Sequence, residues 1–166
     1  RLVPYKRVDL IASAFRAMPD RRLSIIGDGP EMPRVREAAG GAPNIIFRGR
    51  LPQPDLVAAI GAARAFVFAA EEDFGIGMVE AQASGTPLIA YARGGAADIL
   101  RDGETGVLFH DQTVESIIAG VRRFESLVIS PAACRANAER FSQSAFRAKM
   151  QDLIETSLAA RGKPLP

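Results

Sequence analysis

The stretch from Ala65 to Tyr91, AFVFAAEEDFGIGMVEAQASGTPLIAY, decides the fold. Its opening run, Ala65–Ala69, is short and continuously apolar, which is typical of a buried strand. Residues 75–84 carry apolar side chains at helical spacing, and residues 87–91 are a second short apolar run. A strand, a helix and a strand in this order form a βαβ unit, whose two strands are parallel. The stretch therefore predicts part of a parallel sheet.

The same alternation extends over most of the chain. We expect further strands at residues 23–26, 44–49 and 106–109, and helices at residues 8–18, 31–39, 55–63, 96–100 and 114–124. Short apolar strands separated by helices indicate a parallel sheet covered on both faces. The predicted fold class is thus α/β, with a Rossmann-like doubly wound sheet. Because a helix opens the chain where such a fold usually starts with a strand, we expect the first strand to be missing.

Length and composition indicate one domain over residues 1–166, with residues 131–166 as C-terminal helices. The apolar face of these helices, Phe141 through Ile154, must dock against another surface. No apolar run approaches the roughly 18 residues of a membrane span. A formal charge of +2 without basic runs argues against a nucleic-acid partner. The lone Cys134 excludes an internal disulfide, and the lack of a Cys/His cluster excludes a structural zinc site, so we expect a cytoplasmic protein.

Ligands of open α/β sheets bind beyond the C-terminal ends of the strands, so the strand-to-helix turns are informative. The first turn places Arg1 and Lys6 just before a helix, where free N–H groups and the helix dipole favour an anion such as a diphosphate. The turn Gly27–Pro30, GDGP, permits close backbone approach but lacks the further glycine of a dinucleotide fingerprint. Arg48 ends a strand, where its guanidinium plane could meet a nucleobase. For each of these turns, an ordinary turn or a solvated charge is the alternative interpretation.

The turn with the most unusual content is Glu71–Glu80, EEDFGIGMVE. Three acids at the end of a buried strand are costly unless something compensates them. Helix capping by Asp73 is the alternative interpretation, and it explains one acid only. Glu80 shares a helix face with Gly77 and Ser84, on which the glutamate is the single large side chain. That face leaves room for a ligand, and the carboxylate can accept hydrogen bonds from two neighbouring hydroxyls, as on a ribose.

Five segments carry a resemblance to a known family. In chain order they are RLVPYKRVDLIASAF (Arg1–Phe15), LSIIGDGPE (Leu23–Glu31), NIIFRGRL (Asn44–Leu51), EEDFGIGMVEAQASGTPLIA (Glu71–Ala90) and GVLF (Gly106–Phe109). The chain resembles the C-terminal, donor-binding domain of the GT-B retaining glycosyltransferases known as glycosyltransferase family four, group 1. The spacing of Glu72 and Glu80, with FGI between them, is the specific part of the match.

The resemblance implies a role for each candidate residue. Arg1 and Lys6 match the basic pair that neutralises the donor diphosphate. Glu72 matches the catalytic glutamate near the transferred sugar, and Glu80 matches the glutamate that holds the ribose hydroxyls. The other matches lie in the turn facing sugar and phosphate or in the nucleotide-side loops: Phe74, Gly75 and Ile76 in the first, Gly29 and Arg48 in the second. The family uses no metal and no cofactor besides the nucleotide-sugar substrate, because basic side chains and a helix N-terminus offset the charge of the leaving diphosphate.

The resemblance also implies partners. In the family the acceptor site lies in a separate N-terminal domain, which is absent from this chain, so we expect the isolated chain to bind donor without transferring sugar. The stretches PYKRVDL and EEDFGI most resemble the branch that uses GDP-mannose in polysaccharide assembly, which implies a mannosyltransferase, while UDP-sugars stay open. The implied acceptor is a saccharide or a lipid-linked sugar at the cytoplasmic membrane face, reached through the missing domain.

Two other classes of protein compete with this interpretation. One is a non-catalytic nucleotide-binding domain, which would bind the nucleotide without transferring sugar. The other is a sugar-nucleotide epimerase of the same architecture, which needs acid and base residues around the hexose ring. The only histidine of the sequence, His110, follows the last strand, where a solvated turn is the simpler interpretation. The epimerase is therefore disfavoured.

Overall fold

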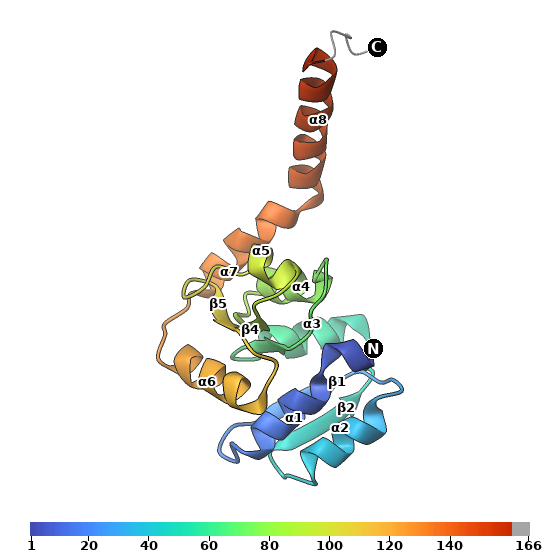
Figure 1. Cartoon of the computed structure of the whole chain (residues 1–166), viewed down its shortest axis with the longest axis vertical. Helices are drawn as coiled ribbons and strands as arrows, with labels where there is room; N and C mark the ends of the chain where they lie inside the picture. Colours follow the sequence, from blue (N-terminus) through green and yellow to red (C-terminus); the bar gives the residue numbers. More distant parts are fainter. Residues whose placement is uncertain (161–166) are drawn as a thin grey trace.

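The computed structural model describes residues 1–160, in which short strands alternate with helices (Figure 1). The strands in this range are β1 (Leu23–Ile26), β2 (Ile45–Gly49), β3 (Phe66–Phe68), β4 (Leu88–Tyr91) and β5 (Gly106–Phe109). Each lies where an apolar run predicts it, with ends that differ by at most about one residue. Apolar patterning alone therefore locates the strands.

The helices also follow the predicted order. Their bounds are η1 (Pro4–Lys6), α1 (Val8–Arg16), α2 (Met32–Ala39), α3 (Gln53–Gly61), α4 (Ile76–Ala83), α5 (Gly95–Ile99), α6 (Val114–Glu125), α7 (Pro131–Ala138), η2 (Glu139–Phe141) and α8 (Gln143–Ala160). Three of the starts carry N-cap side chains: Thr113 accepts a hydrogen bond from Ser116 N, Ser130 from Ala132 N, and Ser142 from Ala145 N. Local sequence thus sets these helix starts.

The strands form two parallel sheets. β1 pairs with β2, with Ile25 opposite Phe47, and the second sheet has the order β3-β4-β5, with Ile89 between Val67 and Val107. The α/β class, with parallel strands flanked by helices, is confirmed, but the strands do not form one continuous sheet. In a doubly wound sheet of order 3-2-1-4-5-6, the first strand lies between the second and the fourth. Within residues 1–160 the β1-β2 sheet and the β3-β4-β5 sheet share no paired strands, and no strand of this range joins them.

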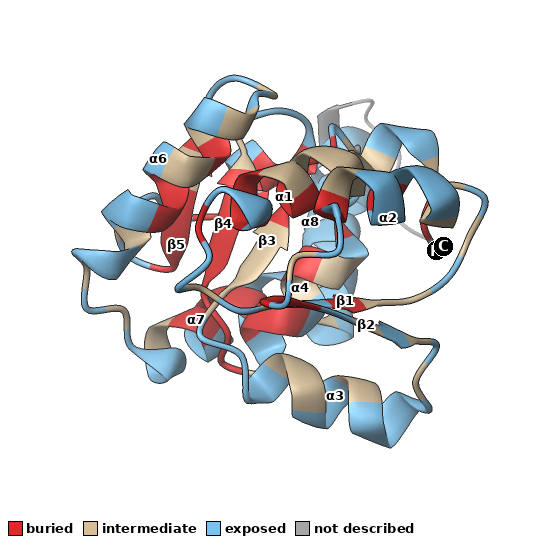
Figure 2. Ribbon diagram, turned by 90° about the horizontal axis from the view of Figure 1, so that it is seen from below, coloured by how far each residue is buried: buried red, intermediate tan, exposed pale blue. Residues whose placement is uncertain are grey.

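Helices cover both faces of the three-stranded sheet (Figure 2). In β4, Ile89 belongs to a core shared with α1, α2 and α6, whereas Leu88 and Ala90 belong to a second core with α4 and α5. This division follows from the alternation of side chains along a strand. The two-stranded sheet packs on α1 and α2 through Ile25. Its other face is more open at Ile46, which is 43% exposed, because α3, described throughout, contributes no buried residue.

A buried polar network fastens α7 to α4. The side-chain amide of Asn137 donates to Gln82 Oε1 and to the carbonyl of Ile99, each at 2.6 Å, and Gln82 Nε2 donates to Thr105 Oγ1 at 2.9 Å. The side chains of Asn137, Gln82 and Thr105 are all buried, so these bonds replace the water that the groups lose on folding. The network fixes the helix that carries Glu80 against the C-terminal part of the domain.

The last helix, α8, projects away from the body of the domain (Figure 1). Its apolar side chains face solvent, since Phe146 is 63% exposed and Leu153 is 58% exposed. The apolar face that was expected to dock therefore has no partner within the described residues. The end of the predicted C-terminal helical region, residues 161–166, lies outside the description. No helix in residues 1–160 is both long and apolar enough to cross a membrane.

Candidate functional site

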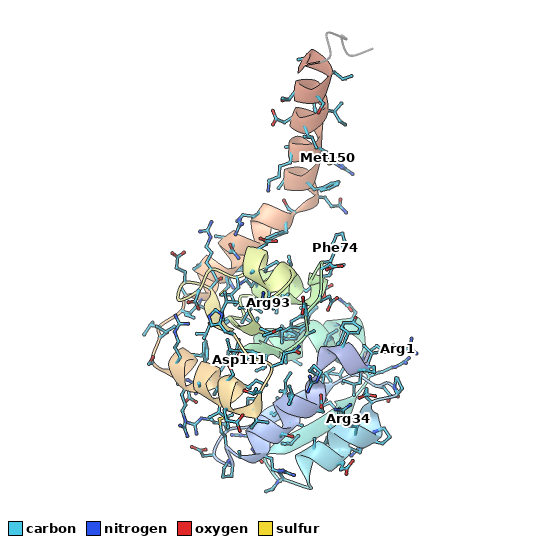
Figure 3. The ribbon with its side chains drawn as sticks, in the orientation of Figure 1. Arg1, Arg34, Phe74, Arg93, Asp111 and Met150 are labelled. Carbon is cyan, nitrogen blue, oxygen red and sulfur yellow. The ribbon has the colours of Figure 1, made fainter. Side chains whose placement is uncertain are left out.

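The turns that the sequence singles out lie beyond the C-terminal ends of the parallel strands. Residues 27–30 follow β1, residues 50–52 follow β2, residues 69–75 follow β3, and residues 92–94 follow β4. Parallel strands end at the same edge of a sheet, so the turns after β1 and β2 lie at one edge of the first sheet, and those after β3 and β4 at one edge of the second. Figure 3 shows Arg1 and Phe74 on the same side of the molecule, consistent with this grouping.

Backbone contacts hold the first residues of the chain beside the turn that follows β1. Leu2 is buried, and its N–H donates to the carbonyl of Asp28 at 2.9 Å. A Cβ atom at Gly29 would overlap the backbone of Leu2, so only a glycine permits this close approach. The structure therefore places the predicted site residue Gly29 as a support for the segment that carries Arg1.

Three cations lie around the backbone nitrogen of Arg1: the side chains of the predicted Arg1 and Lys6, and that of Arg50, which sequence reasoning missed. Glu72 acts on the same nitrogen with the opposite sign. Such effects weaken with distance, so these groups lie within electrostatic reach of one another. Lys6 is half-buried and forms no ion pair with any residue from 1 to 160.

A surface pocket lies beside Arg1. The end of β1, the loop after β2 and one residue of α3 supply the rest of its lining: Ile26, Gly27, Asp28, Arg50, Leu51 and Leu56. The predicted site residue Arg48 lies within β2 and does not line the pocket. Gly49 is the last residue of β2 and has a φ of 63°, the left-handed conformation that favours glycine, and the pocket residue Arg50 follows it. A glycine at the end of a strand was the signal that could have pointed to residue 50.

The start of α4 presents unpaired backbone N–H groups. Its N-cap is Gly75, with a φ of 65°, and no side chain in the described range caps the helix. The alternative interpretation that Asp73 caps this helix is therefore wrong. The N–H groups of Ile76 and Gly77 find no acceptor within residues 1–160. Free N–H groups and the positive end of the helix dipole favour an anion at this point.

Two carboxylates frame the start of α4. Glu72 is half-buried and Glu80 is exposed, and neither carboxylate has a hydrogen-bond or ion-pair partner in the described part of the chain. Next to Glu80, a Cβ atom added at Gly77 would meet no atom within 4 Å, so this helix face has space for a ligand. Phe74 and Ile76 are 81% and 62% exposed, and Figure 3 shows Phe74 pointing outward. Both side chains therefore lie outside the core.

The arrangement suits a ligand in which an anion is joined to hydroxyl-bearing groups. Arg1, Lys6 and Arg50, together with the N–H groups at the start of α4, can neutralise two adjoining phosphates. The carboxylates of Glu72 and Glu80 can accept hydrogen bonds from hydroxyls on either side. Nowhere in residues 1–160 do three His, Cys, Asp or Glu side chains form a group that could hold a metal ion.

Comparison with known proteins identifies relatives of this chain. A family model described as "Glycosyl transferases group 1" matches residues 1–141. The sulfoquinovosyl transferase SQD2 of Arabidopsis thaliana is 30% identical over 155 residues, which cover 89% of this chain and 30% of the relative. The match to the family extends from Arg1 to beyond α7, so it includes every candidate site residue.

A second relative is the GDP-mannose-dependent alpha-(1-6)-phosphatidylinositol monomannoside mannosyltransferase of Mycolicibacterium smegmatis. It is 32% identical over 136 residues, which cover 73% of this chain and 36% of the relative. The chain thus spans about a third of the length of these two relatives. A crystal structure of a glycosyltransferase from Rickettsia africae has a similar fold, with a TM-score of 0.78 over 95% of this chain and 46% of that chain, at 20% identity.

Proposed function

The chain belongs to the glycosyl transferases of group 1, and from this we propose that it is the donor-binding domain of a retaining glycosyltransferase. The observation that carries the proposal is the gathering of three cations, two carboxylates and the uncapped start of α4 at one edge of the sheets. The donor is a nucleoside diphosphate sugar. Its diphosphate meets Lys6, Arg1 and the N–H groups of α4, its ribose meets Glu80, and its transferred sugar meets Glu72.

The site residues act on the charge that develops during transfer. As the bond between the anomeric carbon and the diphosphate oxygen breaks, the electron pair stays on the leaving diphosphate. Arg1, Lys6 and the α4 N–H groups stabilise this charge, and the proposal needs no metal ion for that purpose. The carboxylate of Glu72 accepts a hydrogen bond from the sugar and holds its anomeric carbon toward the acceptor. The oxygen of the acceptor hydroxyl bonds to the anomeric carbon on the face that the diphosphate leaves, which retains the configuration, and the hydroxyl proton passes to the leaving diphosphate oxygen.

GDP-mannose is the donor that we favour. The mycobacterial relative is a GDP-mannose-dependent enzyme by its name, whereas the plant relative is a sulfoquinovosyl transferase, so the family admits other donors. In this chain, Asp28 lines the pocket beside Arg1, and only its Oδ1 is engaged within residues 1–160, by Gly29 N at 2.7 Å. The second oxygen of Asp28 can accept from the amino and ring N–H donors of guanine, a pair that uracil lacks. UDP-sugars are the second candidate.

The identity of the acceptor and the cellular location of the reaction depend on the whole protein. We assign acceptor binding to a further, N-terminal domain, because the chain spans about a third of its relatives and its site presents donor-binding groups only. The acceptor would be a saccharide or a lipid-linked sugar at the cytoplasmic face of a membrane, and polysaccharide assembly is the process that fits it. Any contact with the membrane would be peripheral and made by that further domain.

Calorimetric titration and a transfer assay test this function together. We expect the chain to bind GDP-mannose more tightly than UDP-glucose, and to transfer no sugar to an added acceptor until an acceptor domain is joined to it. Positioning of donor against acceptor contributes roughly 7 to 11 kcal/mol of barrier lowering, which half of a cleft cannot supply.

Each outcome of these two assays has a clear meaning. Binding of no nucleotide would refute the donor site, and sustained transfer by the chain alone would refute the division of labour between the domains. Binding without transfer after the acceptor domain is joined would favour a non-catalytic nucleotide-binding domain. Conversion of the donor sugar to its epimer would favour an epimerase.

A further inference from the structure

The turn between β4 and α5 packs directly against the acidic loop that carries Glu72. The backbone N–H of Gly95 donates to the carbonyl of Glu72 at 2.8 Å. Within residues 1–160 this is the single hydrogen bond that reaches residues 71–74, either from backbone or from side chains. The loop is therefore fixed at its centre by a group from a different strand-to-helix turn.

The approach of the two turns requires two consecutive residues without side chains. Gly94 has φ 58° and ψ −147°, a conformation open almost only to glycine, and a Cβ atom there would lie 2.5 Å from the Glu72 carbonyl oxygen. Gly95 is buried and has an ordinary φ, but its Cβ atom would lie 2.6 Å from the carbonyl oxygen of Asp73. Any side chain at either position must push the acidic loop outward.

We propose that Gly94 and Gly95 are positioning residues, which hold the backbone of Glu72 so that its carboxylate meets the transferred sugar of the donor. The inference rests on the proposed function, because it assumes that a nucleotide sugar occupies this site. Glu72 is half-buried and has no side-chain partner in the described part of the chain, so its backbone must set its place. The nucleotide end of the donor depends instead on Arg1, Lys6, Glu80 and the N–H groups at the start of α4, to which the β4–α5 turn makes no hydrogen bond within residues 1–160.

Two single substitutions distinguish the effect of a Cβ atom that overlaps the acidic loop from the general effect of replacing a glycine. Gly95→Ala places a Cβ atom against the carbonyl oxygen of Asp73, at a residue whose φ is ordinary. The control is Gly103→Ala in the turn before β5, at the opposite edge of the sheet, where φ is 81° but an added Cβ atom meets nothing within 4 Å. The readouts are the dissociation constants of GDP and of GDP-mannose, measured by calorimetry, and of UDP and UDP-glucose if the chain prefers uridine.

We expect Gly95→Ala to weaken binding of the nucleotide sugar about tenfold, and binding of the nucleoside diphosphate by no more than about twofold. Gly103→Ala should change both affinities equally and little. Equal losses for both ligands in Gly95→Ala, or a selective loss in Gly103→Ala, would overturn the positioning role. Failure of the unmodified chain to bind any nucleotide would instead overturn the proposed function itself, and the positioning role with it.

Amide hydrogen exchange of the unmodified chain provides a test that does not depend on folding of a variant. We expect the nucleotide sugar to slow exchange of the Gly95 N–H, because occupation of the sugar site stabilises the loop to which it is bonded. The nucleoside diphosphate alone should leave this rate unchanged. Equal rates with the two ligands would contradict the inference even if Gly95→Ala does not fold.

Discussion

Replacing Lys6 with alanine is expected to weaken binding of GDP or UDP by about 10- to 100-fold, and binding of the free nucleoside by no more than about twofold. Lys6 is half-buried at the end of η1, so the fold sets its position, and it lies within electrostatic reach of the backbone nitrogen of Arg1. No acid in residues 1–160 forms an ion pair with it. A diphosphate bound there therefore gains a charge-assisted contact that a nucleoside lacks.

Calorimetry of nucleotide and nucleoside with the same preparation measures this difference. Lys149→Ala is the matched control, because Lys149 is exposed on α8, away from the site. We expect that variant to bind both ligands as the unmodified chain does. If Lys6→Ala lost the same affinity for nucleotide and nucleoside, Lys6 would be a folding or surface residue rather than a diphosphate ligand.

Glu80→Gln is expected to weaken nucleotide binding by about 1 to 3 kcal/mol, the range for loss of a charge-assisted hydrogen bond. The substitution keeps the shape of the side chain but removes its charge and one of its acceptors. Glu80 is exposed and its carboxylate has no partner among the described residues, so the free energy of unfolding should change by less than about 0.5 kcal/mol.

A ribose without hydroxyls shows whether Glu80 acts on the ribose. With 2′,3′-dideoxy-GDP as ligand, Glu80→Gln should have little further effect, because the hydroxyls that it would bind are gone. Glu115→Gln is the control, since Glu115 is likewise an exposed glutamate on a helix, α6. An equal loss for GDP and its dideoxy analogue would exclude the ribose as the partner of Glu80.

The helices and strands were predictable because their signals are local: short continuous apolar runs for the strands, and apolar side chains at helical spacing for the helices. Residues 65–69 and 87–91 read as strands, and the structure places β3 and β4 there. The division into two sheets was not predictable in the same way, because strand pairing depends on neighbours that a local pattern does not contain. The exposure of the apolar face of α8 was not predictable for the same reason, because periodicity shows which side chains share a face but not what covers that face.

The candidate site was predictable where charge and turn chemistry coincide, at Lys6, Glu72 and Glu80. The site was less predictable where contacts of the backbone position its residues. Gly29 was expected in a nucleotide-side loop, and the structure adds that it lies against Leu2, a contact between residues far apart in sequence. The contact of Gly95 with Glu72 is also a matter of tertiary approach, which leaves no pattern in the sequence around either residue.

The central claim is that the edge formed by Arg1, Lys6 and the start of α4 holds a nucleotide sugar. Its most direct test is a titration of the unmodified chain with GDP-mannose, followed through backbone amide resonances. We expect a saturable response with the largest shifts at Ile76 and Gly77, whose N–H groups have no acceptor in residues 1–160, and with no shift at Gly103 on the opposite edge. Saturation without a response at Ile76 and Gly77, or with shifts confined to the opposite edge, would contradict it.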